Sequence, residues 1–236
     1  TRLDAKDRPL PGVATQWEIS ADGLRYTFHL RPDARWSNGE ALTAHDFVYS
    51  WRRALDPETA SENAYMLYAL KNGQAFNEKE AAPEEVGVRA LDEHTLEVTL
   101  EKPTAYFLSL ASFHAFYPVH RASIEKAPES WSSQAETLIG NGPFRLTGWV
   151  HHGSLSFAKN PYYRDAVSIR LDGMYWPIVD AQATRLTLVE TGQADMMVEP
   201  PVVEHDRLQK EGLLRIAPYL GLYYYVFNTQ APPFDR

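Results

Sequence analysis

The chain has 236 residues and a mass of 26.8 kDa, enough for one large domain or two small ones with a buried core. Hydrophobic residues make up 44% and aromatic residues 12%, which is typical of a folded globular protein and argues against disorder. The net charge of −8 disfavours a nucleic-acid partner, and the absence of cysteine excludes disulfides, thiolate nucleophiles and zinc ribbons.

The first half is rich in predicted strands. Residues 15–19 and 25–30 flank Asp22-Gly23, a strong hairpin signal, and apolar and polar residues alternate along the second strand. A helix is expected after Thr43, which precedes Asp46 by three residues as in a capping box. Further elements are expected as a helix over 62–70, a strand over 96–100 and a short helix over 106–110.

The second half alternates predicted strands and helices. Strands are expected over 144–146, 155–157, 169–175, 195–198, 214–216 and 219–228. Asp180 is expected to cap a helix that reaches Thr191 and stops at Gly192, and a shorter helix is expected over 202–210. This alternation predicts an α/β arrangement, an open sheet with helices on its faces.

No catalytic motif emerges. Gly140-Asn141-Gly142 lacks the third glycine of a dinucleotide fingerprint and is interpreted as a turn. His151 and His152 are adjacent and would face opposite ways on a strand, so a solvated turn is favoured over a metal site. The acidic group around Glu199 and Glu204 is interpreted as the start of a helix. We therefore expect a protein that is not an enzyme and that uses no cofactor or metal.

The aromatic residues leave two interpretations open. Four tyrosines fall within Tyr219 to Tyr225, and on a strand Tyr224 would face opposite to Tyr223 and Tyr225. They could form a core strand or the wall of a ligand cleft. The loop from Phe113 to Tyr117 raises the same question.

Several runs of residues are recognisable together. They are Pro11-Gly12-Val13-Ala14, Asp22-Gly23-Leu24-Arg25-Tyr26-Thr27-Phe28-His29-Leu30-Arg31, Trp36-Ser37-Asn38-Gly39, Thr43-Ala44-His45-Asp46-Phe47-Val48-Tyr49, Asp56-Pro57-Glu58-Thr59-Ala60-Ser61, Asn141-Gly142-Pro143-Phe144 and Lys159-Asn160-Pro161-Tyr162-Tyr163. In this order they strongly resemble the oligopeptide-binding branch of the extracytoplasmic solute-binding proteins, family 5, which serve ABC peptide importers. The resemblance covers essentially the whole chain.

The resemblance implies a mixed α/β fold of which this chain is an N-terminal-half fragment. Members of the family are about twice as long and close two lobes over a peptide. Residues 1–120 would be most of an extra strand-rich α+β domain inserted in the first lobe. Residues 121–236 would be the central part of that periplasmic-binding-protein-like lobe, ending at the hinge strand. The second lobe would be absent. The opening at Thr1 without Met or a signal-peptide region, and the stop at Arg236, lead us to expect truncation at both ends.

The resemblance also suggests ligand contacts. Tyr219 and Tyr224 match tyrosines near the peptide at the hinge, and this favours the cleft interpretation for them. A pocket tyrosine of the family falls at Asn63, and a histidine near the end of longer peptides falls at Phe113, with His114 one residue away. Both positions depart from the family pattern.

The function implied by the resemblance is capture of short peptides outside the cytoplasmic membrane and delivery to an ABC permease. The location would be periplasmic, or extracytoplasmic with a lipid anchor. Alternatives are another cargo on the same fold (murein peptide, nickel chelate or sugar) or the sensor domain of a cytoplasmic transcription regulator. We expect no nucleic-acid partner for the chain itself, and exposed half-cleft surface should favour self-association.

Core positions are expected among the aromatic and aliphatic residues of both halves. In the first half they are Trp17, Tyr26, Phe28, Trp36, Phe47, Trp51 and Leu100, and in the second Phe144, Phe157, Leu171, Leu186, Val189 and Ile216.

Overall fold

The structure is a computed structural model that describes residues 1–4, 6–217 and 221–235. The chain divides into two compact units, residues 1–178 and residues 179–236, hereafter unit 1 and unit 2. Residues 121–178 thus belong to the same compact unit as residues 1–120. The boundary between the compact units lies at 178/179 and not at 120/121. As a boundary between family domains, 120/121 stays a prediction.

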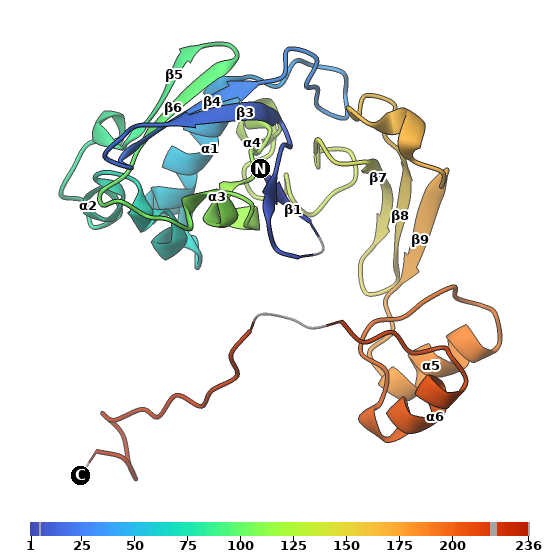
Figure 1. Ribbon diagram of the computed structural model, residues 1–236. Coiled ribbons are helices and arrows are strands. Elements are labelled where there is room, and N and C mark those ends of the chain that lie inside the picture. The colour runs from blue at the N-terminus through green and yellow to red at the C-terminus, as the bar shows by residue number, and fades with distance from the viewer. Residues whose placement is uncertain (5, 218–220, 236) are drawn as a thin grey trace. The chain divides into compact units, whose positions relative to one another are not determined.

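A four-stranded antiparallel sheet forms one layer of unit 1 (Figure 1). Its strands follow the order β3-β4-β6-β5, where β3 is Ala14–Ile19, β4 Arg25–Leu30, β5 Val88–Asp92 and β6 Thr95–Thr99. The predicted hairpin is confirmed, with Trp17 opposite Phe28 and Gly23 in the turn at φ +70°. The strand predicted over 96–100 is confirmed as β6.

Helix α1, Ala44–Leu55, lies against one face of this sheet (Figure 1). It begins as the sequence predicts, because the Asp46 carboxylate accepts the Thr43 backbone N–H at 2.7 Å and so satisfies a donor that the helix leaves unpaired. The chain of unit 1 also forms short helices: η1 Pro57–Thr59, η2 Ala64–Ala69, α2 Gly73–Asn77, η3 Pro83–Glu85, α3 Phe107–Leu110, η4 His114–Phe116 and α4 Arg121–Lys126. The helix predicted over 62–70 is thus the 3₁₀ helix η2.

The core of unit 1 fills the space between the sheet and α1. Tyr26, Phe28, Trp51 and Leu100 are buried there, while Trp17 and Phe47 are half-buried against it, and Trp36 is buried in a neighbouring cluster. All seven core positions predicted for the first half are therefore confirmed as wholly or partly buried.

A second sheet of unit 1 has three antiparallel strands in the order β7-β8-β9 (Figure 1). They are β7 Phe144–Val150, β8 Ser154–Lys159 and β9 Gly173–Pro177, preceded by η5 Ala166–Ser168. The pairing of the first two was predicted. The third begins four residues later than expected, and Leu171 is 60% exposed, so its assignment to the core was wrong. A two-stranded ribbon, β1 Arg2–Leu3 with β2 Pro9–Leu10, completes unit 1.

Unit 2 contains helix α5, Gln182–Glu190, followed by η6 Val202–Glu204 and α6 His205–Lys210. The helix stop is confirmed, because Gly192 has φ +71°, a conformation that costs a Cβ-bearing residue steric strain. Asp180 is not its cap: the residue before α5 is Ala181. Leu186 is buried and Val189 half-buried, as are Phe144 and Phe157 in unit 1.

The strands predicted over 195–198 and 214–216 are absent, and residues 221–228 form no strand. Ile216 is 72% exposed, so its core assignment was also wrong. A strand needs a hydrogen-bonded neighbour. The described part of unit 2 supplies none, so the layered open sheet expected for the second half is replaced by the antiparallel β7-β8-β9 sheet and a separate helical unit.

Candidate functional site

The turn at Trp36–Gly39 is joined by hydrogen bonds to the Gly140–Pro143 loop. The Ser37 backbone N–H donates to the Gly140 carbonyl at 2.7 Å, and the Gly140 N–H donates to Ser37 Oγ at 3.3 Å. The run Trp36–Gly39 is therefore bonded to the residue that directly precedes the run Asn141–Phe144, within unit 1.

Asn160 attaches the run Lys159-Asn160-Pro161-Tyr162-Tyr163 to the same loop. Its side chain is fully buried, and its Nδ2 donates to the Gly142 carbonyl at 2.8 Å, while its backbone N–H donates to the Pro143 carbonyl at 2.9 Å. Its Oδ1 accepts the Tyr162 N–H at 3.0 Å. Both the oxygen and the nitrogen of this buried amide are thus hydrogen-bonded to backbone groups, so Asn160 fixes the loop.

Gly39 lets the turn Trp36–Gly39 approach Tyr162 closely. It has φ +92°, and a Cβ built there would lie 3.0 Å from the Tyr162 ring. Both the backbone conformation and the space favour glycine at this position. The residue pattern marked Gly39 only as a turn, because the contact partner lies more than a hundred residues away.

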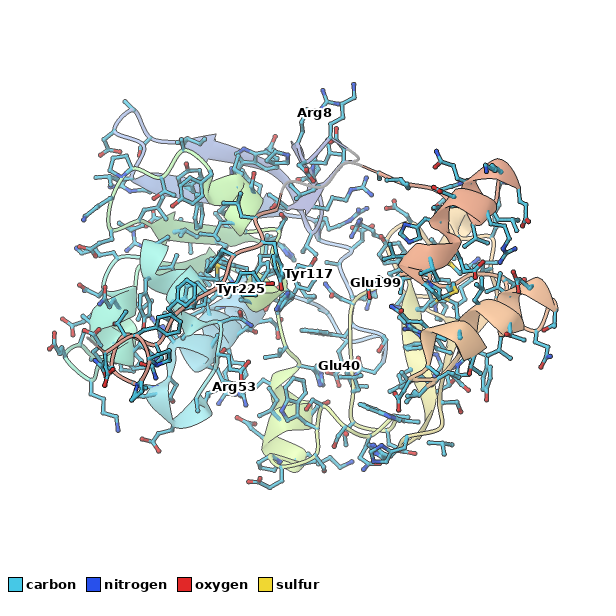
Figure 2. The ribbon with its side chains drawn as sticks, turned by 90° about the horizontal axis from the view of Figure 1, so that it is seen from below. Arg8, Glu40, Arg53, Tyr117, Glu199 and Tyr225 are labelled. Carbon is cyan, nitrogen blue, oxygen red and sulfur yellow. The ribbon has the colours of Figure 1, made fainter. Side chains whose placement is uncertain are left out.

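A buried histidine joins the same turn to α4. His120 Nε2 lies 2.6 Å from Glu40 Oε2, and its Nδ1 accepts the Ser123 backbone N–H at 3.3 Å as the cap of α4. Because Nδ1 accepts, Nε2 carries the proton and donates to the carboxylate. This hydrogen bond, with a second from Asn38, holds the pKa of Glu40 below its usual range. Glu40 extends from the loop between β4 and α1 (Figure 2).

Three of the predicted ligand residues lie together on unit 1. The Asn63 Nδ2 is 3.4 Å from His114 Nε2, and the Phe113 and His114 rings have centroids 4.0 Å apart. Asn63 and Phe113 are half-buried and His114 is exposed. Asn63 precedes η2 and Phe113 precedes η4, so two short helices bring the three side chains to one surface.

The tyrosine segment belongs to unit 2. Tyr224 is 73% exposed, and Tyr219 lies outside the described residues. The rings of Tyr223 and Tyr225 contact each other edge-on with centroids 5.5 Å apart, which follows from their spacing of two along an extended segment. All three described tyrosines are exposed, so the core-strand interpretation does not hold for them.

The histidines and acidic residues that the sequence analysis assigned to turns and helix starts lie in such places in the structure. His151 and His152 lie in the exposed turn between β7 and β8. Glu204 pairs with Arg207 at 2.7 Å near the start of α6. Among the described residues, no cluster of three or more His, Asp or Glu has metal-binding geometry, and no helix is long and apolar enough to cross a bilayer.

Residues 8–236 match the profile of the bacterial extracellular solute-binding proteins, family 5 (middle region). The chain belongs to this family. The expectation drawn from the recognisable runs of residues is therefore confirmed at the level of the family.

Several curated relatives of this family 5 chain are named as peptide-binding proteins, and another, 38% identical over 99% of this chain and 44% of its own length, is named as the probable deoxycholate-binding periplasmic protein YgiS of Escherichia coli. It is 37% identical to the dipeptide-binding protein DppE of Bacillus subtilis, over 100% of this chain and 43% of that protein. It is also 37% identical to the oligopeptide-binding protein OppA of the same species, over 100% of this chain and 44% of that protein. A third relative, 37% identical over 97% of this chain and 43% of its own length, is the periplasmic murein peptide-binding protein MppA of Escherichia coli.

Solved structures agree with the fold of the family 5 chain. Haemophilus influenzae OppA in complex with RPPGFSPFR superimposes with a TM-score of 0.89 at 31% identity, covering 100% of this chain and 47% of that one. Peptide-bound OppA of Listeria monocytogenes gives a TM-score of 0.78 at 38% identity. The match covers 82% of this chain and 38% of that one. The chain thus spans less than half the length of these relatives.

Proposed function

We propose that the protein to which this chain belongs is the substrate-binding component of an ABC importer, which captures short peptides outside the cytoplasmic membrane and delivers them to a membrane permease. The observation that carries the proposal is the similarity of this chain, over 82–100% of its length, to family 5 proteins that are named for, or crystallised with, peptides. The family is one of binding proteins, in keeping with the lack of a nucleophile and base pair in the sequence.

Peptide capture in such a protein relies on main-chain hydrogen bonds and on pairing of the peptide termini, with water filling loose side-chain pockets. Asn63, Phe113 and His114 would form one wall of the site, supported by their contact on unit 1. Tyr219 and Tyr224 would also contact the peptide, and the exposed ring of Tyr224 supports this for that residue.

Murein peptide is the second candidate cargo. The similarity to MppA, as high as the similarity to the two peptide-binding relatives above, favours it over nickel chelates or sugars. Periplasmic or lipid-anchored location is part of the proposal and is supported by the extracellular assignment of the family.

The test uses the full-length protein and calorimetric titration with tri-alanine. Tyr224→Ala should weaken binding by about 1–2 kcal/mol, since it removes a ring face and one hydroxyl, which corresponds to a factor of about 5 to 30. Tyr223→Ala is the matched control, because adjacent residues of an extended segment face opposite ways. Unchanged affinity in a folded Tyr224→Ala variant would remove Tyr224 from the site, and no peptide binding by the wild-type protein would refute the proposed function.

A further inference from the structure

Three Asn-Gly pairs occur in the chain, at Asn38-Gly39, Asn72-Gly73 and Asn141-Gly142. Such a pair can lose ammonia without an enzyme, because the backbone nitrogen of the glycine can attack the carbonyl carbon of the asparagine side chain. Glycine favours this step, since it has no side chain to hinder the approach and its backbone adopts many conformations. All three pairs have the same local sequence, so the fold decides which of them can react.

The first pair is held by hydrogen bonds of its reacting groups. The Gly39 N–H donates to the Trp36 carbonyl at 2.9 Å, and Asn38 Oδ1 accepts the Glu40 N–H at 3.1 Å. Both bonds must break before the glycine nitrogen can reach the asparagine side chain. The cost of this local opening slows the reaction at Asn38, although its side chain is exposed.

The second pair is held in the same way and is less accessible. Gly73 is buried, and its N–H donates to the Leu70 carbonyl at 2.9 Å. The Asn72 side chain is also bound, because its Nδ2 donates to the Glu85 carbonyl at 3.1 Å. Attack by the Gly73 nitrogen therefore requires both bonds to open, so the fold protects Asn72 as well.

Asn141-Gly142 differs from both of these pairs. Within the described ranges, neither the Asn141 side chain nor the Gly142 N–H makes a hydrogen bond. Chain neighbours aside, a Cβ built on Gly140 would meet no atom within 4 Å, and one built on Gly142 would meet only the Phe144 carbonyl oxygen, at 4.0 Å. The reacting groups are thus unbonded and the backbone around them has open space.

The residues on either side of Asn141 are anchored. The Gly140 carbonyl accepts the Ser37 N–H at 2.7 Å, and the Gly142 carbonyl accepts Asn160 Nδ2 at 2.8 Å. The main chain between the two anchors therefore has a defined length. A main chain made longer at position 141 could not keep both hydrogen bonds in place.

We propose that Asn141 is a site of spontaneous deamidation and that its isoaspartyl product loosens this loop. The Gly142 nitrogen forms a bond to Asn141 Cγ and gives up its proton, while the Cγ–Nδ2 bond breaks and ammonia leaves, which closes a succinimide ring. Water then adds to one of the two ring carbonyls and breaks the bond between that carbon and the ring nitrogen.

The two products differ in their main chain. Addition of water at Cγ leaves an ordinary aspartate. Addition at the backbone carbonyl of residue 141 leaves an isoaspartate, in which the main chain runs through the former side chain and is longer by one methylene group. Each product adds a negative charge, but only the isoaspartate changes the distance between the anchors at Gly140 and Gly142.

The test is incubation of the full-length protein at mildly alkaline pH, followed by mass-spectrometric peptide mapping of the three pairs. The full-length protein is used because Thr1 lines the same cavity as Asn141, so the chain on both sides of this segment should be in place. In the folded protein, Asn141 should deamidate at least about tenfold faster than Asn38 and Asn72. In urea the three rates should agree within about threefold, because protection by the fold is lost.

Equal rates at the three pairs in the folded protein, or a faster reaction at Asn38 or Asn72, would overturn the proposal. Asn141→Gln should abolish the fast reaction, because glutamine must close a larger ring, which forms more slowly. Asn228→Gln, at an exposed asparagine outside the three pairs, is the control and should change the rate at Asn141 by less than about twofold. A fast reaction that persists in Asn141→Gln would place the modification elsewhere.

Urea unfolding separates the effect of the longer main chain from that of the added charge. Asn141→Asp carries the charge of the deamidated protein on an ordinary main chain. Wild-type protein aged to a high isoaspartate content should unfold at a lower urea concentration than Asn141→Asp, while Asn141→Gln aged in parallel should not change. Equal midpoints for the aged wild type and Asn141→Asp would refute the loosening of the loop.

Discussion

Asn160 is the clearest case of a single side chain that organises a loop. It is completely buried, and its amide hydrogen bonds reach the Gly142 carbonyl and the Tyr162 backbone N–H. A buried carbonyl left without a donor is costly, because the water it gave up on folding is not replaced. The run Lys159-Asn160-Pro161 was recognisable in the sequence, but its role follows from the loop that it contacts.

Asn160→Leu should lower the free energy of unfolding by about 1–3 kcal/mol, since leucine has a similar shape and leaves the Gly142 carbonyl unpaired. Urea unfolding measures the change. Asn228→Leu is the control at an exposed asparagine and should change stability by less than about 0.5 kcal/mol. Equal losses in the two variants would contradict the assigned role of Asn160.

Glu40 gives the fold a dependence on pH. Its pKa is held below the ordinary value of 4.5 by the hydrogen bond from His120 and then by that from Asn38. A carboxylate whose pKa is lower in the folded state than in the unfolded state stabilises the fold. This contribution is complete at pH values above the unfolded-state pKa. It is lost as the pH falls from the unfolded-state pKa through the folded-state pKa.

The wild-type chain should therefore lose more stability between about pH 6 and about pH 3 than Glu40→Gln, which cannot titrate at this position. Urea unfolding at the two pH values measures the difference. Glu80→Gln, at an exposed glutamate, should behave like the wild type. The same loss in Glu40→Gln and wild type would show that the His120–Glu40 contact does not stabilise the folded state.

At the scale of elements, Arg207 links helices α5 and α6 of unit 2. From α6 its guanidinium contacts Glu190 at the end of α5 at 2.5 Å, and Glu204 and Glu211 at 2.7 and 3.0 Å. These hydrogen bonds, led by that from Glu204, raise the pKa of Arg207 above its usual range. One cation thus holds three carboxylates that would otherwise repel each other.

Arg207→Met should speed amide hydrogen exchange in residues 182–190 and 205–210, because it removes the cation and leaves the three carboxylates facing each other. The difference from wild type should shrink in about 1 M NaCl, where repulsion at the surface is screened. Arg215→Met provides an exposed arginine as the control. A difference that does not respond to salt would indicate that Arg207 acts through packing alone.

At the scale of the whole molecule, apolar surface is unevenly distributed. The core of unit 1 is closed by α1 and the four-stranded sheet, whereas Tyr175 and Trp176 of β9 and the segment 222–227 are well exposed. Large exposed apolar areas mark surfaces that bind something. This is in keeping with a chain that spans 43% of its dipeptide-binding relative. Self-association of the isolated chain stays a prediction.

Peptide affinity is expected to require more than these 236 residues. Enclosure buries a ligand from two sides, while the cost of ordering remains at several kcal/mol when one side is missing. An affinity of about 1 μM in a complete protein corresponds to about −8 kcal/mol, so loss of half the contacts should leave only millimolar binding of tri-alanine. Calorimetry on the isolated chain checks this, with the full-length protein as the positive control. Micromolar one-to-one binding to the isolated chain would place the whole site within it.

Much of unit 1 was predictable from the sequence because its signals are local. Asp22-Gly23 between alternating strands specifies a hairpin, and Thr43 with Asp46 specifies a helix start, through hydrogen bonds between near neighbours. The end of α5 is also a local signal, because Gly192 adopts a positive φ that glycine allows at little cost. Of the predicted ligand residues, Asn63, Phe113 and His114 are adjacent in space, but the sequence supplied them only through the family resemblance.

The tertiary structure decided whatever depends on distant partners. Residues 195–198 and 214–216 have apolar patterns that suit a strand, yet they form none, because a strand exists only where another backbone offers hydrogen bonds. The pairing of Glu40 with His120 and the close approach of Gly39 to Tyr162 likewise join residues far apart in the chain. Composition and spacing determined the local elements and the family. Which side chains meet was fixed by packing, since burial and hydrogen bonding act between neighbours in space whatever their separation in sequence.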